Sequence, residues 1–95
     1  MIAEIQCLPS PAGTPESAYA HIEAAIAVVV ASGLRYEVGA LGTTVEGSAD
    51  EVWAVLRDAH EATLDSGAGT VVSVVKAFSG GDSGPGIDDL VAAHR

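Results

Sequence analysis

Polar side chains recur along the strands that the sequence predicts, and they are the residues best suited to bind a ligand. Alternation places one group of them on a single face of the predicted sheet: Glu4, Gln6, Arg35, Glu37, Thr44 and Glu46, with Ser73 as a further candidate. Carboxylates complement positive charge, and every buried polar group needs a hydrogen-bond partner. Enclosed between packed sheets, such a cluster could hold a cationic, hydrogen-bonding heterocycle.

The same residues also allow a structural interpretation. Arg35 lies opposite Glu46 in the predicted hairpin, where the two side chains could form a cross-strand ion pair while the other polar groups remain solvated. The sequence leaves both interpretations open.

Patterns for catalysis or metal binding are weak. His21, His60 and His94 fall on three different predicted elements, without the ligand spacing of a zinc motif. Cys7 is the only cysteine, and its predicted position facing the helices favours a buried thiol over a nucleophile. No serine lies in a nucleophile elbow, and the glycine-rich turns lack the lysine of a phosphate loop. We therefore expect a non-enzymatic protein with no catalytic residue, metal or cofactor.

The first half of the chain predicts a strand, a helix and a hairpin. Residues 2–8 alternate as a strand, which we expect Pro9 to end. Thr14 is the expected helix cap and Pro15 the first helical residue, and Gly33 ends the helix. Helical spacing predicts a core stripe that consists of Tyr19, Ile22, Ile26, Val29 and Val30.

A β-hairpin with a defined register is expected to follow this helix. If Ala40 and Leu41 form the centre of the turn, the cross-strand pairs are Arg35 with Glu46, Tyr36 with Val45, Glu37 with Thr44, and Val38 with Thr43.

The second half predicts a helix, a strand and a short closing helix. Ser48 and Glu51 form a capping box that opens a helix to about Ser66, with Val52, Val55, Leu56, Ala59 and Thr63 on its buried face. Residues 70–78 form a strand with valines on both faces, which implies burial on both sides. Residues 79–86 are an irregular loop, and residues 87–94 form the last helix.

This order of elements, β-α-β-β-α-β with short connections, predicts an α+β ferredoxin-like fold. Right-handed crossovers place both long helices on one face of a four-stranded antiparallel sheet. The opposite face would then carry valines together with Ile2 and Leu8. A second copy of the chain is the simplest cover for them, so we expect a homo-oligomer, with a tetramer favoured over a dimer.

Composition limits the class of protein. With 95 residues, the chain is expected to be one domain, residues 1–95. Its net charge of −9 argues against nucleic acid or an anionic membrane as a partner and suits a cationic or neutral small ligand. The single cysteine fits a cytoplasmic location, and no apolar run approaches the length of a membrane span.

Two motifs and their setting resemble a known family. Ser-Gly-Leu-Arg-Tyr-Glu at residues 32–37 and Gly-Thr-Thr-Val-Glu-Gly at residues 42–47 are followed by a helix that contains Ala-His-Glu. With the opening Met-Ile-Ala-Glu-Ile, they resemble the thiamine-binding (YkoF-like) family of small ferredoxin-like domains, over residues 1–76. Members typically carry an arginine where this chain has Thr70, and a charged cluster where it continues with Phe78-Ser-Gly-Gly.

The resemblance implies a non-catalytic homo-oligomer that binds thiamine or its hydroxymethylpyrimidine moiety and acts as a carrier or sensor. The alternative is a structural or regulatory homo-oligomer without a small ligand. If a ligand binds, we expect its aminopyrimidine and thiazolium to contact the residues Glu4, Gln6, Glu37, Thr43, Thr44 and Glu46.

Overall fold

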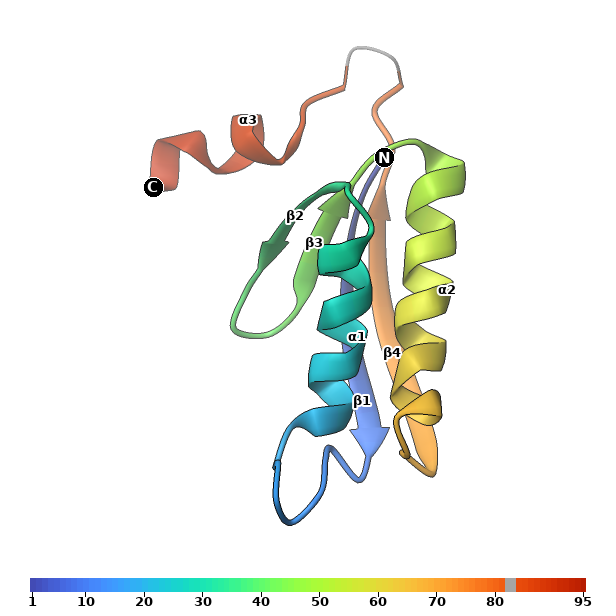
Figure 1. Ribbon diagram of the computed structural model, residues 1–95. Helices are drawn as coiled ribbons and strands as arrows, with labels where there is room; N and C mark the ends of the chain where they lie inside the picture. The colour runs from blue at the N-terminus through green and yellow to red at the C-terminus, as the bar shows by residue number, and fades with distance from the viewer. Residues whose placement is uncertain (82–83) are drawn as a thin grey trace.

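The computed structural model describes residues 1–81 and 84–95 and has the predicted order of elements (Figure 1). The elements are β1 (Ile2–Ser10), α1 (Ala20–Ala31), β2 (Arg35–Val38), β3 (Thr43–Glu46), α2 (Ala49–Asp65), β4 (Thr70–Phe78), α3 (Ile87–Val91) and a terminal 3-10 turn (Ala92–His94). The ferredoxin-like α+β fold is confirmed. Asp82 and Ser83, which belong to the predicted loop 79–86, lie outside the described residues.

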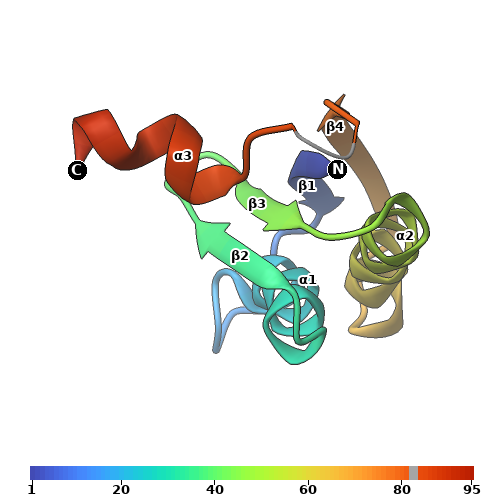
Figure 2. The same ribbon diagram turned by 90° about the horizontal axis from the view of Figure 1, so that it is seen from above.

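The four strands form an antiparallel sheet in the order β2-β3-β1-β4, and α1 and α2 cover one of its faces. Figure 2 shows α3 on the other side of β2 and β3, away from α1. The core between helices and sheet is built from small aliphatic residues, of which Val29, Val45 and Val52 are almost completely buried. No helix among residues 1–81 and 84–95 is long and apolar enough to cross a membrane.

The first strand is longer than predicted, because Pro9 does not end it. Pro9 pairs with Val71 and Ser10 with Thr70, so β1 runs beside β4 to its last residue. Beyond Ile5, β1 has no partner on its β3 side. A proline is tolerated where the missing N–H faces an unpaired edge, and Pro9 occupies such a position.

The prediction that Thr14 and Pro15 open the first helix was wrong. Residues 14–17 form a tight turn in which Thr14 Oγ1 accepts a hydrogen bond from Ser17 N at 3.1 Å, and the helix begins at Ala20. The early N–H of His21 is bonded to Ala12 O at 3.0 Å. The loop thus satisfies a helix-end donor that a capping side chain would otherwise serve. Gly33, with φ of 79°, follows the helix as predicted.

The buried stripe of α1 also differs from the prediction. His21, Ala25 and Val29 are buried, whereas Tyr19 is 63% exposed and Val30 is 47% exposed. His21 can be buried because its Nδ1 bonds Ser66 Oγ at 2.6 Å, at the far end of α2. Ser66 Oγ also donates to Thr63 O at 2.9 Å, so this serine links His21 to the backbone of α2.

The hairpin and the second helix agree with the sequence. All four predicted cross-strand pairs of β2 and β3 are present. Ser48 and Glu51 form the predicted capping box, and the hydrogen bond from Ser48 N, with that of its side chain, lowers the pKa of the Glu51 carboxyl. Of the predicted buried face, Val55 alone is only partly buried.

The prediction that β4 is buried on both faces is not met within one chain. β4 pairs with β1 over all of its residues, but in the described part of the chain no strand lies beside its other edge. Val72, Val74 and Phe78 remain 62%, 49% and 47% exposed. Ser73 was expected as a candidate on this open face, yet it lies opposite Cys7 and faces the helices.

Candidate functional site

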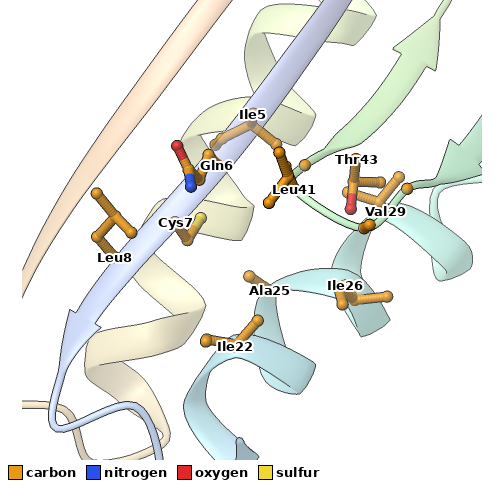
Figure 3. A pocket seen from close by; sticks show the side chains of 13 residues that line it. Ile5, Gln6, Cys7, Leu8, Ile22, Ala25, Ile26, Val29, Leu41 and Thr43 are labelled. Atoms are coloured by element: carbon orange, nitrogen blue, oxygen red, sulfur yellow. The ribbon is translucent and has the colours of Figure 1, made fainter.

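A cavity of about 230 Å³ lies between the second half of β1, the middle of α1 and the turn 39–42 (Figure 3). Its walls are mainly apolar, and the residues that line it include Ile5, Cys7, Leu8, Ile22, Ala25, Ile26, Val29 and Leu41. Gln6 and Thr43 contribute the polar side chains. An apolar pocket with a few polar groups is the usual form of a small-molecule site, and its size suits a single heterocycle.

The cavity exists because β3 pairs with only the first half of β1. Met1 and Gly47 exchange backbone hydrogen bonds of 2.8 and 3.1 Å. Backbone groups alternate sides along an antiparallel strand, so those of Ala3, Ile5 and Cys7 also point toward β3. The last pair between the two strands is Ile5 with Thr43. Residues 39–42, which precede Thr43, form the turn to β2 and do not pair with β1.

Cys7 therefore presents an unpaired backbone N–H and C=O to the cavity. Within the described residues β1 has no partner strand at this point. Free strand edges bind extended peptides and other molecules with matching donors and acceptors, because backbone polar groups need partners. The pair formed by the N–H and C=O of Cys7 suits a planar heterocycle that carries a donor beside an acceptor.

Two polar side chains complement this edge. In Figure 3 the Gln6 amide lies across β1 from Thr43, as its place opposite Val74 on the open face requires, and the Thr43 hydroxyl oxygen lies beside Val29. Thr43 is 6% exposed. An amide and a hydroxyl can each donate and accept, so together they can orient a ligand that touches the Cys7 edge.

The thiol of Cys7 has the character of a buried structural group. Burial raises its pKa, and the hydrogen bond from Ser73 only partly opposes this effect. Ser73 Oγ donates to Cys7 Sγ at 3.5 Å and lies 2.5 Å from His60 Nδ1. Cys7, Ser73 and His60 thus form a chain of side-chain contacts between β1, β4 and α2.

The open face of the sheet carries the other expected site residues. Glu4, Thr44, Glu46 and Glu37 lie there, as the register requires. Thr43 lies on the helix side of β3, so the structure does not bring all the expected residues together. Gln6 and Thr43 line the cavity, and Glu4 lies against Gly42, where a Cβ would come within 3.1 Å of the Glu4 carboxyl carbon.

The C-terminal segment binds two of the acids on this face, Glu37 and Glu46. Ile87 is 3% exposed, and its N–H donates to Glu46 Oε1 at 2.6 Å. Arg35 forms an ion pair with Asp88 at 2.6 Å, and Arg95 pairs with both Asp88 and Glu37. The alternative ion pair of Arg35 with Glu46 is therefore replaced, in the described residues, by contacts of both side chains with α3.

This docking predicts a pH dependence. The hydrogen bond from Arg35 lowers the pKa of the Asp88 carboxyl. The ionised form is the one that binds, so docking is complete above the usual aspartate pKa and is lost as pH falls through the lowered value. We expect the amide NMR signal of Ile87 to shift toward an undocked position on acidification.

An Asp88→Asn variant provides the control for this titration. Asparagine keeps the shape of the side chain but cannot change charge. The part of the Ile87 chemical-shift change that follows the titration of Asp88 should therefore be absent in this variant. A wild-type Ile87 signal that stays constant through this range would contradict the role of Asp88.

Residues 1–81 and 84–95 contain no group of three or more His, Cys, Asp or Glu residues that could hold a metal ion. The chemistry that the site offers is hydrogen bonding and apolar contact in the cavity, with carboxylates nearby.

Comparison with known proteins gives consistent results. A UPF0045 protein of Clostridium perfringens is 30% identical over 77 residues, which are 81% of this chain and 80% of the relative. The structure of a domain of unknown function, DUF77, from Bacillus cereus superposes with a TM-score of 0.83 at 34% identity, and covers 100% of this chain and 91% of that one.

A third comparison bears on function. A putative thiamine biosynthesis/salvage protein from Thermotoga maritima has a TM-score of 0.80 at 25% identity, over 99% of this chain and 97% of that chain. The family model for thiamine-binding proteins matches residues 3–95. On this match over almost its whole length, the chain belongs to the thiamine-binding protein family.

Proposed function

We propose that this protein binds thiamine or its hydroxymethylpyrimidine moiety in the cavity between β1, α1 and the turn 39–42, without catalysing a reaction, as a homo-oligomeric carrier or sensor. Membership of the thiamine-binding family carries the proposal. The cavity supports it, because it combines apolar walls with an unpaired backbone edge and two polar side chains.

The aminopyrimidine has the features that this cavity can recognise. Its amino group donates beside a ring nitrogen that accepts, which matches the C=O and N–H of Cys7 on the free edge of β1. Gln6 and Thr43 add hydrogen bonds from both sides. The apolar ring faces contact the aliphatic side chains of α1.

The thiazolium of thiamine would lie toward the rim, where carboxylates favour its positive charge. Glu4 lies beside Gly42 at this rim. Glu37, Thr44 and Glu46 belong to the other part of the open face, and Glu37 and Glu46 are already bound by the C-terminal segment. We therefore assign Glu4, Gln6 and Thr43 to the ligand, and Glu37 and Glu46 to the docking of the C-terminal segment.

Assembly is the second part of the proposal. Leu8, Val72, Val74 and Phe78 form an exposed apolar strip on the open face of β1 and β4, at 47–62% exposure, which the ion pair of Glu4 with Lys76 interrupts before Phe78. Within residues 1–81 and 84–95, the outer edge of β4 has no strand beside it. Exposed apolar side chains beside a free edge are typical of an interface, and a second copy would cover both, in a dimer or tetramer.

Calorimetry on matched variants tests the ligand proposal. We expect thiamine and hydroxymethylpyrimidine to bind the wild-type protein, and Thr43→Val to weaken both by about tenfold, because one hydrogen bond in a buried site is lost. Valine keeps the shape of threonine, so circular dichroism should remain unchanged. Glu46→Gln, on the other face of β3, should bind as the wild type does.

The pair of variants also distinguishes the two faces. If Glu46→Gln weakens binding and Thr43→Val does not, the ligand lies on the open face. If neither ligand produces heat with the wild-type protein, or a change in its thermal unfolding, the proposed function is wrong.

A further inference from the structure

Every basic side chain of this protein is already paired with a carboxylate. The chain has four lysines and arginines against 13 acids. Arg35 binds Asp88, and Arg95 binds Glu37 and Asp88. Arg57 lies 3.3 Å from Asp58, and Lys76 lies 3.8 Å from Glu4. These pairs include all four bases, so each has a competing anion within the protein itself.

None of these bases is among the residues that line the cavity, and an acid, Glu4, contacts one of the lining residues. The lining of the cavity consists of aliphatic side chains, glycines, Cys7, Gln6 and Thr43. Glu4 lies against Gly42 in that lining, with its carboxyl carbon 3.1 Å from where a Cβ would stand. The side chain of Lys76, its partner, is 81% exposed and extends into solvent.

A phosphate group would meet unfavourable surroundings here. It carries about 1.5–2 negative charges at neutral pH and is usually held by arginine, lysine or a row of free backbone N–H groups. In the turn beside the cavity, the N–H of Gly39 is already bonded to Gly42 O at 2.9 Å. The net charge of −9 adds long-range repulsion.

We infer that the cavity selects unphosphorylated thiamine and its free pyrimidine, and that it discriminates against thiamine monophosphate and diphosphate, with Glu4 as the specificity-determining residue at the rim. This inference rests on the proposed function. It assigns to the protein the free vitamin, the form that a kinase consumes or a phosphatase releases, as its ligand.

Calorimetry with a graded set of ligands tests the inference on the full-length chain. Hydroxymethylpyrimidine, thiamine, thiamine monophosphate and thiamine diphosphate share the same pyrimidine and differ in charge. We expect the monophosphate to bind about tenfold or more weakly than thiamine, and the diphosphate more weakly still, because each phosphate adds negative charge near the Glu4 carboxylate. Raising the salt concentration should narrow the difference.

Comparing Glu4→Gln with Glu61→Gln separates the effect of the charge at the rim from the effect of net charge. Both variants lose one negative charge, but Glu61 is exposed on α2, which contributes no residue to the cavity. We expect Glu4→Gln to weaken thiamine, to strengthen the phosphates and to leave the free pyrimidine unchanged, and Glu61→Gln to change none of them appreciably.

The outcomes separate this inference from the proposed function. Equal affinity for thiamine and its phosphates, or tighter binding of the phosphates, would overturn the inference while the proposed function stands. An unchanged ratio in Glu4→Gln would remove Glu4 from the selection. Failure of thiamine and of the free pyrimidine to bind at all would contradict the proposed function itself.

Discussion

Replacing Ala25 by leucine is expected to abolish ligand binding while the domain remains folded. Ala25 is 5% exposed, lies on the α1 side of the cavity and contributes to its lining (Figure 3). A leucine side chain at this position would occupy part of the space that the pyrimidine ring needs. We expect affinity for thiamine to fall by about a hundredfold or more, which corresponds to roughly 3 kcal/mol.

The stability of the Ala25→Leu variant distinguishes a filled cavity from a misfolded protein. Adding volume to a close-packed core usually destabilises it, whereas volume added to an existing cavity can be tolerated. Thermal unfolding should therefore show a folded Ala25→Leu protein. Ala27→Leu, on the exposed side of the same helix, is the matched control and should bind normally. Wild-type affinity in a folded Ala25→Leu protein would place the ligand elsewhere.

The parts of the fold that were predictable from sequence are governed by local contacts. The hairpin register follows from the position of its turn and the alternation of its side chains, and it was correct for every pair. The capping box of Ser48 and Glu51 needs only residues three apart. Gly33 ends the first helix, because its positive φ of 79° is accessible to glycine at little cost.

The first helix shows where local rules were insufficient. Thr14 and Pro15 have the residue types of a helix start, but the loop bonds the N–H of His21 through Ala12, so a later start is stabilised. His21 enters the core in place of Tyr19 because Ser66, 45 positions away, provides its hydrogen-bond partner. A periodicity argument cannot include a partner so distant in the sequence.

The candidate site was only partly predictable for the same reason. Gln6 and Thr43 were named from residue type, but the cavity that joins them depends on where β3 stops along β1, a pairing of distant segments. The acids of the open face were placed on the correct side, yet the contact of Glu46 with Ile87, 41 residues away, was not foreseen. The chain therefore satisfies part of the acidic face with its own C-terminal segment.

The remaining apolar surface leads to the second large effect, which concerns assembly. A Val74→Asp substitution is expected to convert the proposed oligomer into single chains of 9.5 kDa, as measured by light scattering at micromolar concentration. Val74 lies opposite Gln6 on the open face and is 49% exposed in one chain. If a second copy covers it, the new carboxylate would be buried without a partner, which is strongly unfavourable.

Val38→Asp is the control, because Val38 is a strand valine of similar exposure, 46%, on β2 and distant from β4. It should keep the wild-type mass. A wild-type protein that is monomeric under these conditions would refute the assembly, and an unchanged mass in Val74→Asp would exclude this face from the interface.

The negative charge of each chain makes association depend more strongly on the apolar strip. Each copy has a net charge of −9, so association brings like charges together and must be driven by apolar burial. Because salt screens the repulsion and leaves the apolar contribution in place, the wild-type oligomer should tighten as ionic strength rises. In Val74→Asp the apolar contribution is itself interrupted, so added salt should recover assembly only in part.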